Sequence, residues 1–260
     1  MHMTRILGAS ALALSFVVGT AGCSTADASS TREQAAPTRP KPDVAALRGG
    51  MMGADYNVQP SAAHVQRLAE YSVLGKVVAW HEGPRYSNGV KLSDGSQDVQ
   101  LFGVMEIETE QDFKSPDGGA KRRFVRVYRG VLPFDEEGDV VPAPKGTFYS
   151  ALSLGDLKRA IPLGTRVVVI ANEIVVKEHR SDEGNVVVIR DWTQDEGSPL
   201  LTPYPQGLLF ETGDGDYASG GMAEAQEDVA FGQWPASPEF TGSTRAGTFE
   251  ALRVQLAAKQ

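Results

Sequence analysis

Histidine and cysteine, two side chains that often carry out acid–base or nucleophilic chemistry, are scarce in this 260-residue sequence, which has four histidines and one cysteine. His81, beside Glu82 at the end of a predicted strand, is one candidate, because a histidine that pairs with a carboxylate elsewhere in the fold can act as a proton-transfer couple. The fragment His81-Glu82-Gly83-Pro84-Arg85 begins like the zinc-protease motif H-E-x-x-H, but it lacks the second histidine, and its Gly-Pro step would break a helix. His64, on a predicted helix surface, and His179, in a charged stretch, are expected to be solvated. Serine-hydrolase, P-loop and dinucleotide-binding signatures are absent from the sequence.

A second candidate site lies in the step Gly213-Asp214-Gly215-Asp216, where two carboxylates stand two residues apart on a glycine-rich backbone. With Glu211 as a third oxygen ligand, Asp214 and Asp216 are the residues expected at a calcium site, since Ca²⁺ takes about six to eight oxygen ligands. The EF-hand pattern is not met, because Ala218 occupies its fifth position. The alternative is a solvated Gly-Asp turn, which is a common use of these residues. Calcium is the one cofactor that the sequence suggests.

The only cysteine, Cys23, follows a short apolar segment near the N-terminus. Arg5 precedes the apolar run 6–18, which is shorter than the roughly 20 residues of a membrane-spanning helix and fits the core of a secretory signal peptide. The step Thr20-Ala21-Gly22-Cys23 resembles the lipobox of bacterial lipoproteins, with Thr20 in place of the usual Leu or Val. That resemblance implies removal of residues 1–22, acylation of the Cys23 thiol and attachment to the extracytoplasmic face of a membrane.

A competing cleavage site is Ala26-Asp27-Ala28, which has the small-residue pattern that ordinary signal peptidases use. Cleavage there would discard Cys23 and release a secreted protein beginning at Ser29. Neither product contains a pair of cysteines, so the exported domain must be held together without disulfides. Residues 24–43 are rich in Ser, Ala and Pro, and we expect them to form a flexible tether.

The net charge of −8 is concentrated in one part of the chain. Residues 194–247 hold nine acidic side chains and one basic one, together with many glycines and prolines. This composition disfavours regular structure, so we expect an irregular segment packed on or beside the β-domain. Nucleic acid is not an expected partner, because no basic face with interleaved aromatic residues is evident.

Alternating and β-branched apolar runs predict five strands, at residues 73–80, 99–110, 123–132, 165–171 and 186–192. Ser153 and Asp156 resemble a capping box and predict a short helix between the third and fourth strands. Further helices are expected after Ser61 and over residues 248–259. The order strand-strand-strand-helix-strand-strand is that of a small OB-like barrel, although a sandwich would give a similar pattern.

We therefore expect a mainly β protein organised in six parts. They are a signal peptide (1–22), lipidated Cys23 with its tether (23–43), a linker with a short helix (44–72), a β-domain (73–193), the acidic segment (194–247) and a C-terminal helix (248–260). The favoured function is that of a non-catalytic lipoprotein that binds a protein partner or a component of the cell envelope. The alternatives are an enzyme assembled around His81 and Glu82, and a calcium-dependent structural protein.

Overall fold

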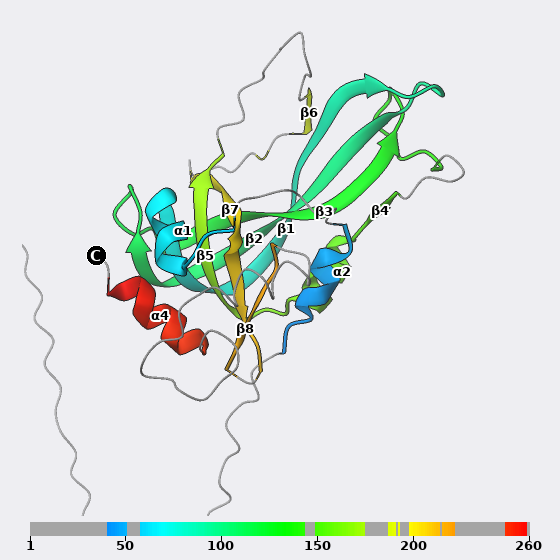
Figure 1. Ribbon diagram of the computed structural model, residues 1–260. Helices are drawn as coiled ribbons and strands as arrows, with labels where there is room; N and C mark the ends of the chain where they lie inside the picture. The colour runs from blue at the N-terminus through cyan, green and yellow to red at the C-terminus, as the bar shows by residue number, and fades with distance from the viewer. Residues whose placement is uncertain are drawn as a thin grey trace, which may run out of the picture. The chain divides into compact units, whose positions relative to one another are not determined.

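The computed structural model is mainly β and is built on one closed barrel (Figure 1). The residues that it describes are 41–50, 58–143, 149–174, 187–190, 192, 198–213, 215–221 and 248–258. All of them belong to one compact unit of the chain, which begins at Thr38. Within these ranges, no helix is both long enough and apolar enough to cross a membrane.

Five strands form the barrel: β1 (Tyr71–Lys91), β2 (Gln97–Lys114), β3 (Arg122–Phe134), β5 (Arg166–Glu173) and β7 (Leu200–Glu211). Four antiparallel pairings, β3–β2, β2–β1, β1–β5 and β5–β7, lead around the ring, and a parallel pairing between β7 and β3 closes it. Helix α2 (Leu154–Ala160) lies between the third and fourth strands of this ring. The predicted OB-like barrel is therefore confirmed, and the sandwich alternative is not the fold.

The barrel interior is filled by apolar side chains, because successive residues on a strand point to opposite faces. Every barrel strand contributes to this core, as the buried Val77, Met105, Val125, Val169 and Phe210 illustrate. A single continuous core of this kind can hold the domain together without a disulfide.

Helix α2 closes one end of the barrel. Its N-terminus has both hydrogen bonds of the predicted capping box, from Ser153 and from Asp156. Leu157 and Ile161 are buried in the barrel core, and the indole N–H of Trp80 donates to the Ile161 carbonyl oxygen at 3.2 Å. The short 3₁₀-helix η1 (Val44–Gly50) contacts α2 and adds two apolar side chains to the same core.

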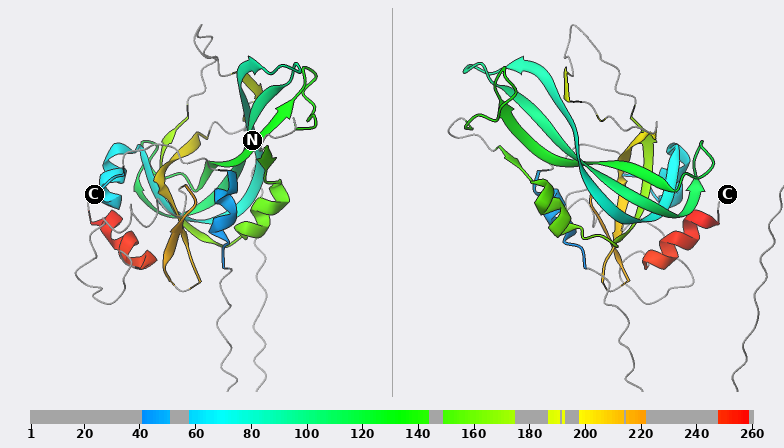
Figure 2. Two further views of the ribbon diagram at one scale, coloured as in Figure 1. Left: turned by 45° about the vertical axis from the view of Figure 1, so that its right-hand side comes forward. Right: turned by 180° about the vertical axis from the view of Figure 1, so that it is seen from behind.

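Helices α1 (Ala62–Leu68) and α4 (Phe249–Ala257) lie side by side and cover the outer face of β5 and β7 (Figure 2). Helix α1 begins at the predicted cap Ser61, and α4 begins after Thr248, whose side chain accepts a hydrogen bond from the backbone N–H of Ala251. The predicted apolar stripe of the C-terminal helix is buried against strand residues, and its members are Phe249, Leu252 and Leu256. Helix α4 therefore packs through the face that the spacing of apolar residues indicated. In α1, Val65 is buried as expected, but Leu68, expected on the same face, is 50% exposed.

Beyond the barrel, the first three strands continue as an arm, defined here as residues 82–91 of β1, 97–103 of β2 and 128–134 of β3 (Figure 1). Two short strands flank the arm: β4 (Ser150–Ala151) pairs with β3, and β6 (Val187–Arg190) pairs with β1. A small separate core of Val99, Leu101 and Phe134 packs within it.

The sequence-based assignment of the fifth barrel strand to residues 186–192 is wrong. Residues 187–190 form β6 beside the arm, whereas the closing strand β7 lies inside the segment 194–247 that was expected to be irregular. Strand β8 (Tyr217–Ser219) then pairs with β7, so the β-domain continues past residue 193. Pro203 and Pro205 explain why this strand was not expected in the barrel, because proline lacks the backbone N–H that donates to a neighbouring strand. Here the register of β7 against β5 shifts just after Pro203, in an irregularity that accommodates the prolines.

Candidate functional site

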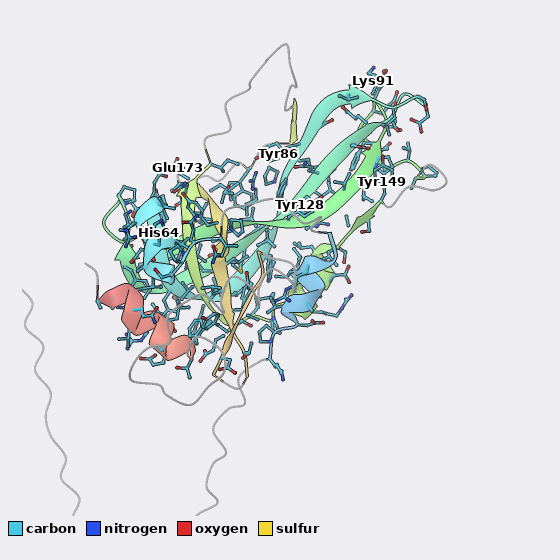
Figure 3. The ribbon with its side chains drawn as sticks, viewed as in Figure 1. His64, Tyr86, Lys91, Tyr128, Tyr149 and Glu173 are labelled. Carbon is cyan, nitrogen blue, oxygen red and sulfur yellow. The ribbon has the colours of Figure 1, made fainter. Side chains whose placement is uncertain are left out.

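One outer face of the three long strands gathers aromatic side chains around Arg126. The strand register places Val104 of β2 opposite both His81 of β1 and Arg126 of β3, and places Phe102 opposite Tyr128. Residues two apart on a strand share a face, so the outward-pointing residues of neighbouring strands meet here. We call this group the aromatic face; its members are His81, Tyr86, Phe102, Phe124, Arg126, Tyr128 and Trp192. Figure 3 shows Tyr86 and Tyr128 in the region where the arm joins the barrel.

Arg126 is held by aromatic rings. Its guanidinium carbon lies 4.4 Å from the ring centroid of Phe102 and 5.7 Å from that of Tyr86. The Phe102 ring meets the rings of Tyr86 and Tyr128 edge-on, each at 5.5 Å between centroids. Burial lowers the pKa of the Arg126 guanidinium and raises the pKa of the Tyr128 hydroxyl. Among the described residues, no carboxylate lies within ion-pair distance of Arg126, so cation–π contacts are its main support.

His81 forms a hydrogen-bonded pair, but its partner is not its sequence neighbour. Its Nε2 lies 2.9 Å from Oε2 of Glu106, and the other oxygen of Glu106 accepts from Arg122 at 3.0 Å. The imidazole packs against Trp192, at 5.7 Å between ring centroids, and near Phe124 at 6.3 Å. This arrangement orients the ring and leaves its side chain 39% exposed. The couple that the sequence suggested therefore exists as His81 with Glu106.

Glu82 lies apart from this pair. Its carboxylate accepts a hydrogen bond from Arg129 at 2.6 Å, and Arg129 also donates to the Leu152 carbonyl oxygen near the start of α2. Successive strand residues point to opposite faces, which separates the two side chains. The Gly83-Pro84 step that follows lies at a shift in the β1–β2 register, which is where a strand tolerates proline. The structure thus does not bring His81 and Glu82 together in one site.

The calcium candidates lie around the turn between β7 and β8. Asp214 falls outside the described residues, so the proposed ligand set cannot be assembled from the structure. Glu211 is paired across the barrel edge with Arg166, at 3.6 Å, and the backbone N–H of Thr212 donates to the Asp216 carbonyl oxygen. No group of three His, Cys, Asp or Glu side chains suited to a metal ion occurs among the residues that the structure describes. The calcium site therefore stays a prediction.

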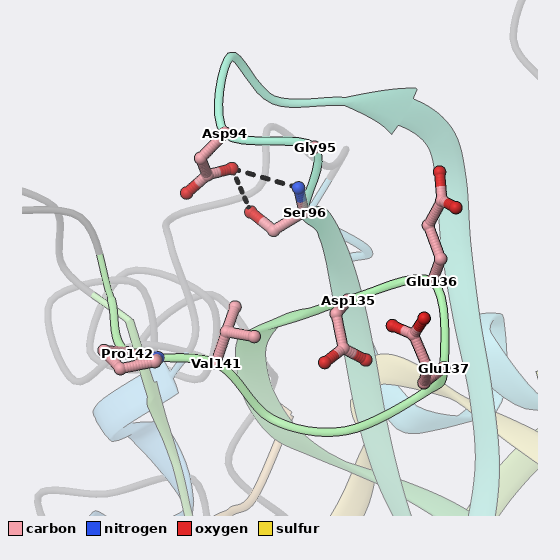
Figure 4. A pocket seen from close by; sticks show the side chains of 8 residues that line it. All are labelled: Asp94, Gly95, Ser96, Asp135, Glu136, Glu137, Val141 and Pro142. Carbon is pink, nitrogen blue, oxygen red and sulfur yellow. Dashed lines mark hydrogen bonds between the residues drawn. The ribbon is translucent and has the colours of Figure 1, made fainter.

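The tip of the arm holds an acidic pocket of about 410 Å³ (Figure 4), which the sequence analysis did not identify. It lies between the β1–β2 turn and the turn that follows β3, and its acidic lining residues are Asp94, Asp135, Glu136 and Glu137. Three of these carboxylates are already engaged. Asp94 accepts from the backbone N–H and the hydroxyl of Ser96, Asp135 accepts from the backbone N–H of Asp139, and Glu136 pairs with Lys91. These contacts account for three of the four acidic residues as parts of two tight turns.

Several residues singled out in the sequence lie outside the described ranges. They are Cys23, the alternative cleavage site at residues 26–28, most of the tether, and His179. His64 is described, and its Nδ1 lies 2.8 Å from the Arg67 guanidinium on the surface of α1. The lipidation of Cys23 and both cleavage hypotheses remain predictions.

The sequence analysis missed the aromatic face. A signal for it was present in β3, where Phe124, Arg126 and Tyr128 alternate with the apolar residues of the core. Phe102 and Tyr86 come from two other strands, and only the register brings them beside Arg126. The cluster thus depends on long-range pairing, which local patterns do not report.

Comparison with known proteins gives no match, whether to a protein-family model, to a curated protein or to a solved structure. The function therefore has to be argued from the chain's own residues. The aromatic face is the strongest basis for that argument, because it combines flat apolar rings with one desolvated cation.

Proposed function

We propose that this chain is a lipid-anchored, extracytoplasmic lipoprotein with a non-catalytic domain that binds a component of the cell envelope through the aromatic face. The observation that supports this binding function most directly is the setting of Arg126 against the rings of Phe102 and Tyr86, with no described carboxylate beside it. Binding sites typically combine aromatic walls with a small number of polar groups.

The position of the aromatic face in the barrel supports the same proposal. In barrels of this topology the outer face of the second and third strands commonly binds extended ligands, together with the neighbouring loops. The face described here lies on β1, β2 and β3, and Trp192 is contributed by the connection between β5 and β7. A shared barrel topology does not by itself establish a ligand, so the proposal depends on the residues of the aromatic face.

The anchor rests on the sequence alone. The apolar run 6–18, the step ending at Cys23 and the polar tether together fit a lipoprotein displayed outside the cytoplasmic membrane. One acyl chain holds a protein to a membrane only marginally, whereas two or more give stable attachment. The intact mass of the protein extracted from membranes tests this part. We expect a chain that begins at Cys23 and carries acyl groups, and a mass that begins at Ser29 would contradict it.

Co-sedimentation with isolated cell-envelope material tests the binding function. We expect the chain comprising residues 24–260 to sediment with envelope fragments, and Tyr128→Ala to lower the bound fraction at least threefold, because it removes a partly exposed ring of the aromatic face. Tyr204→Ala is the matched control, since Tyr204 packs with α1 and α4 on the outer face of β5 and β7 and donates to the Leu68 carbonyl oxygen. Absence of sedimentation, or equal loss in both variants, would contradict the proposal.

The hydrogen bond between His81 and Glu106 favours one second candidate, an enzyme that acts on the bound envelope component. The same sedimentation assay separates the two functions. An enzyme would change the mass of released envelope fragments over time, and His81→Asn would abolish that change. A binding module leaves the fragments chemically unaltered.

A further inference from the structure

We infer that the ligand of the aromatic face is an acidic saccharide, with the carboxylate of a sugar acid on the Arg126 guanidinium and its ring against Tyr128. This inference rests on the proposed binding function and names the ligand class. It combines three observations. Arg126 is a desolvated cation without a described carboxylate partner, Arg126 and Tyr128 are two residues apart on β3, and β3 is paired with strands on both sides.

The first observation is that Arg126 is a desolvated cation. Its neighbours in the sequence and the fold show what this protein does with buried guanidinium groups elsewhere. Arg123 is paired with Asp112 and Asp117, and Arg129 is paired with Glu82. Arg126 has aromatic rings in place of carboxylates among the described residues. Burying a charged group without an opposite charge beside it costs free energy. An anion that binds Arg126 would therefore gain more binding free energy than one that binds an exposed arginine.

The shape of the guanidinium favours an anion that presents two oxygens side by side. Its fork of N–H donors matches a carboxylate in a bidentate geometry, which a point-like ammonium would not do. Phe102 and Tyr86 lie beside the group, and no described carboxylate is within ion-pair distance of its N–H donors, so these donors are the part that a bound anion would contact. Because the face has one desolvated cation, it matches a ligand that carries one negative charge per sugar residue.

The second observation is the spacing of Arg126 and Tyr128. They are two residues apart on β3, so their Cα atoms are separated by about 7 Å and their side chains share a face. One sugar ring with its exocyclic carboxylate fills such a span. The apolar C–H face of the ring would pack on Tyr128, and the exposed Gln100, opposite Tyr86 in the register, can donate to hydroxyl groups.

The third observation disfavours the other polymers. Nucleic acid binding draws most of its affinity from several phosphate contacts, whereas this chain has a net charge of −8 and one desolvated cation on the face. A peptide would normally add a strand at an open sheet edge. β3 is paired with β2 on one side and with β7 and β4 on the other, which leaves only a short gap between β7 and β4.

Calorimetric titration tests the inference with three probes: an oligomer of galacturonic acid, the same oligomer with its carboxylates reduced to alcohols, and single-stranded DNA of equal length. We expect residues 24–260 to bind the acidic oligomer at least tenfold more tightly than the reduced one, and not to bind the DNA. Arg126→Gln should remove this tenfold preference. Arg126→Lys keeps the charge but loses the fork, and should lower affinity severalfold.

The controls keep a failure of folding apart from a failure of binding. Arg159→Gln removes the same charge from the exposed surface of α2 and should leave the titration unchanged. Thermal unfolding of each variant shows whether it is folded. If Arg126→Gln does not fold, the titration of Arg126→Lys tests the inference in its place. Equal affinity for the acidic and reduced oligomers, tight binding of DNA, or no effect of either Arg126 variant would each overturn the inference. Sedimentation with envelope material that persists despite such a result would leave the proposed binding function standing.

Discussion

Arg123 and Arg126 lie three residues apart on β3, and the strand turns them to opposite faces with different partners. Arg123 points into the end of the barrel, where its side chain is 1% exposed. It is paired with Asp117 and Asp112 and stacks over Tyr71 at 5.2 Å. Arg126 points outward among aromatic rings. In the sequence, Arg123 forms part of a basic run with Lys121 and Arg122, and nothing local marks it as buried.

Replacing Arg123 by Met tests how much this buried ion pair contributes to the free energy of unfolding. The change leaves the carboxylates of Asp112 and Asp117 facing the barrel end without their cation, so we expect a loss of about 3 kcal/mol in the free energy of unfolding. Urea denaturation followed by circular dichroism measures it. Arg159→Met, which breaks an exposed pair on α2, should stay close to the wild type. A similar small effect for both variants would show that the ion pair is not a structural support.

The same ion pair predicts the direction of a pH dependence. Hydrogen bonds from Arg123 hold the pKa of Asp117 well below its usual range. A carboxyl whose pKa is lowered on folding stabilises the protein fully above its unfolded pKa of about 3.9, and that contribution is lost as the pH falls below it. Denaturation at pH 7, 5, 4 and 3 should therefore show stability declining below about pH 5, with a shallower decline in Arg123→Met. Parallel curves for the two proteins would contradict this assignment.

At the scale of elements, the sequence predicts what depends on neighbours along the chain. The caps at Ser61, Ser153 and Thr248 are recognisable because each involves residues within a single turn of helix. The first four barrel strands are recognisable because their apolar residues alternate or run together. The fifth was assigned to the wrong residues because β7 carries two prolines, and its pairing to β3 and β5 joins residues far apart in sequence.

Gly207 of β7 lies close against the backbone of β5, so a substitution there tests the closure of the barrel. A Cβ atom at this position would lie 2.2 Å from the Ile170 carbonyl oxygen, which belongs to the backbone of β5. We expect Gly207→Ala to lower stability by about 2 kcal/mol, because one of the two strands must move. Thermal or urea unfolding measures the change.

A second glycine supplies the matched control for Gly207→Ala. In Gly155→Ala the new Cβ would meet only ordinary contacts, the nearest at 3.5 Å, and it removes a glycine from the first turn of α2. Its stability should stay equal to the wild type or rise by up to about 1 kcal/mol. A Gly207→Ala protein as stable as Gly155→Ala would mean that β7 does not lie this close to β5.

For the whole molecule, the barrel and the aromatic face depend on the same long strands. β1, β2 and β3 form three of the five barrel strands and also carry most of the aromatic face, so the site needs the closed ring to keep its geometry. The fold class and the element order were predictable from sequence, whereas the site was not. His81 was identified, but its partner Glu106 and the cluster around Arg126 follow from register between strands.

Truncating the chain at two points tests whether β7 or the segment 186–192 completes the barrel. A chain that ends at Ser198 keeps residues 186–192 but lacks β7, so the ring stays open between β3 and β5 and we expect no cooperative unfolding transition. A chain that ends at Gly221 keeps the closed ring and loses α4, whose buried Phe249, Leu252 and Leu256 cover the outer face of β5 and β7. That chain should unfold cooperatively at a lower temperature than the chain with α4, because it exposes apolar surface. Near-ultraviolet circular dichroism during heating distinguishes the two. If the shorter chain melted as sharply as the longer one, residues 186–192 rather than β7 would have to complete the barrel.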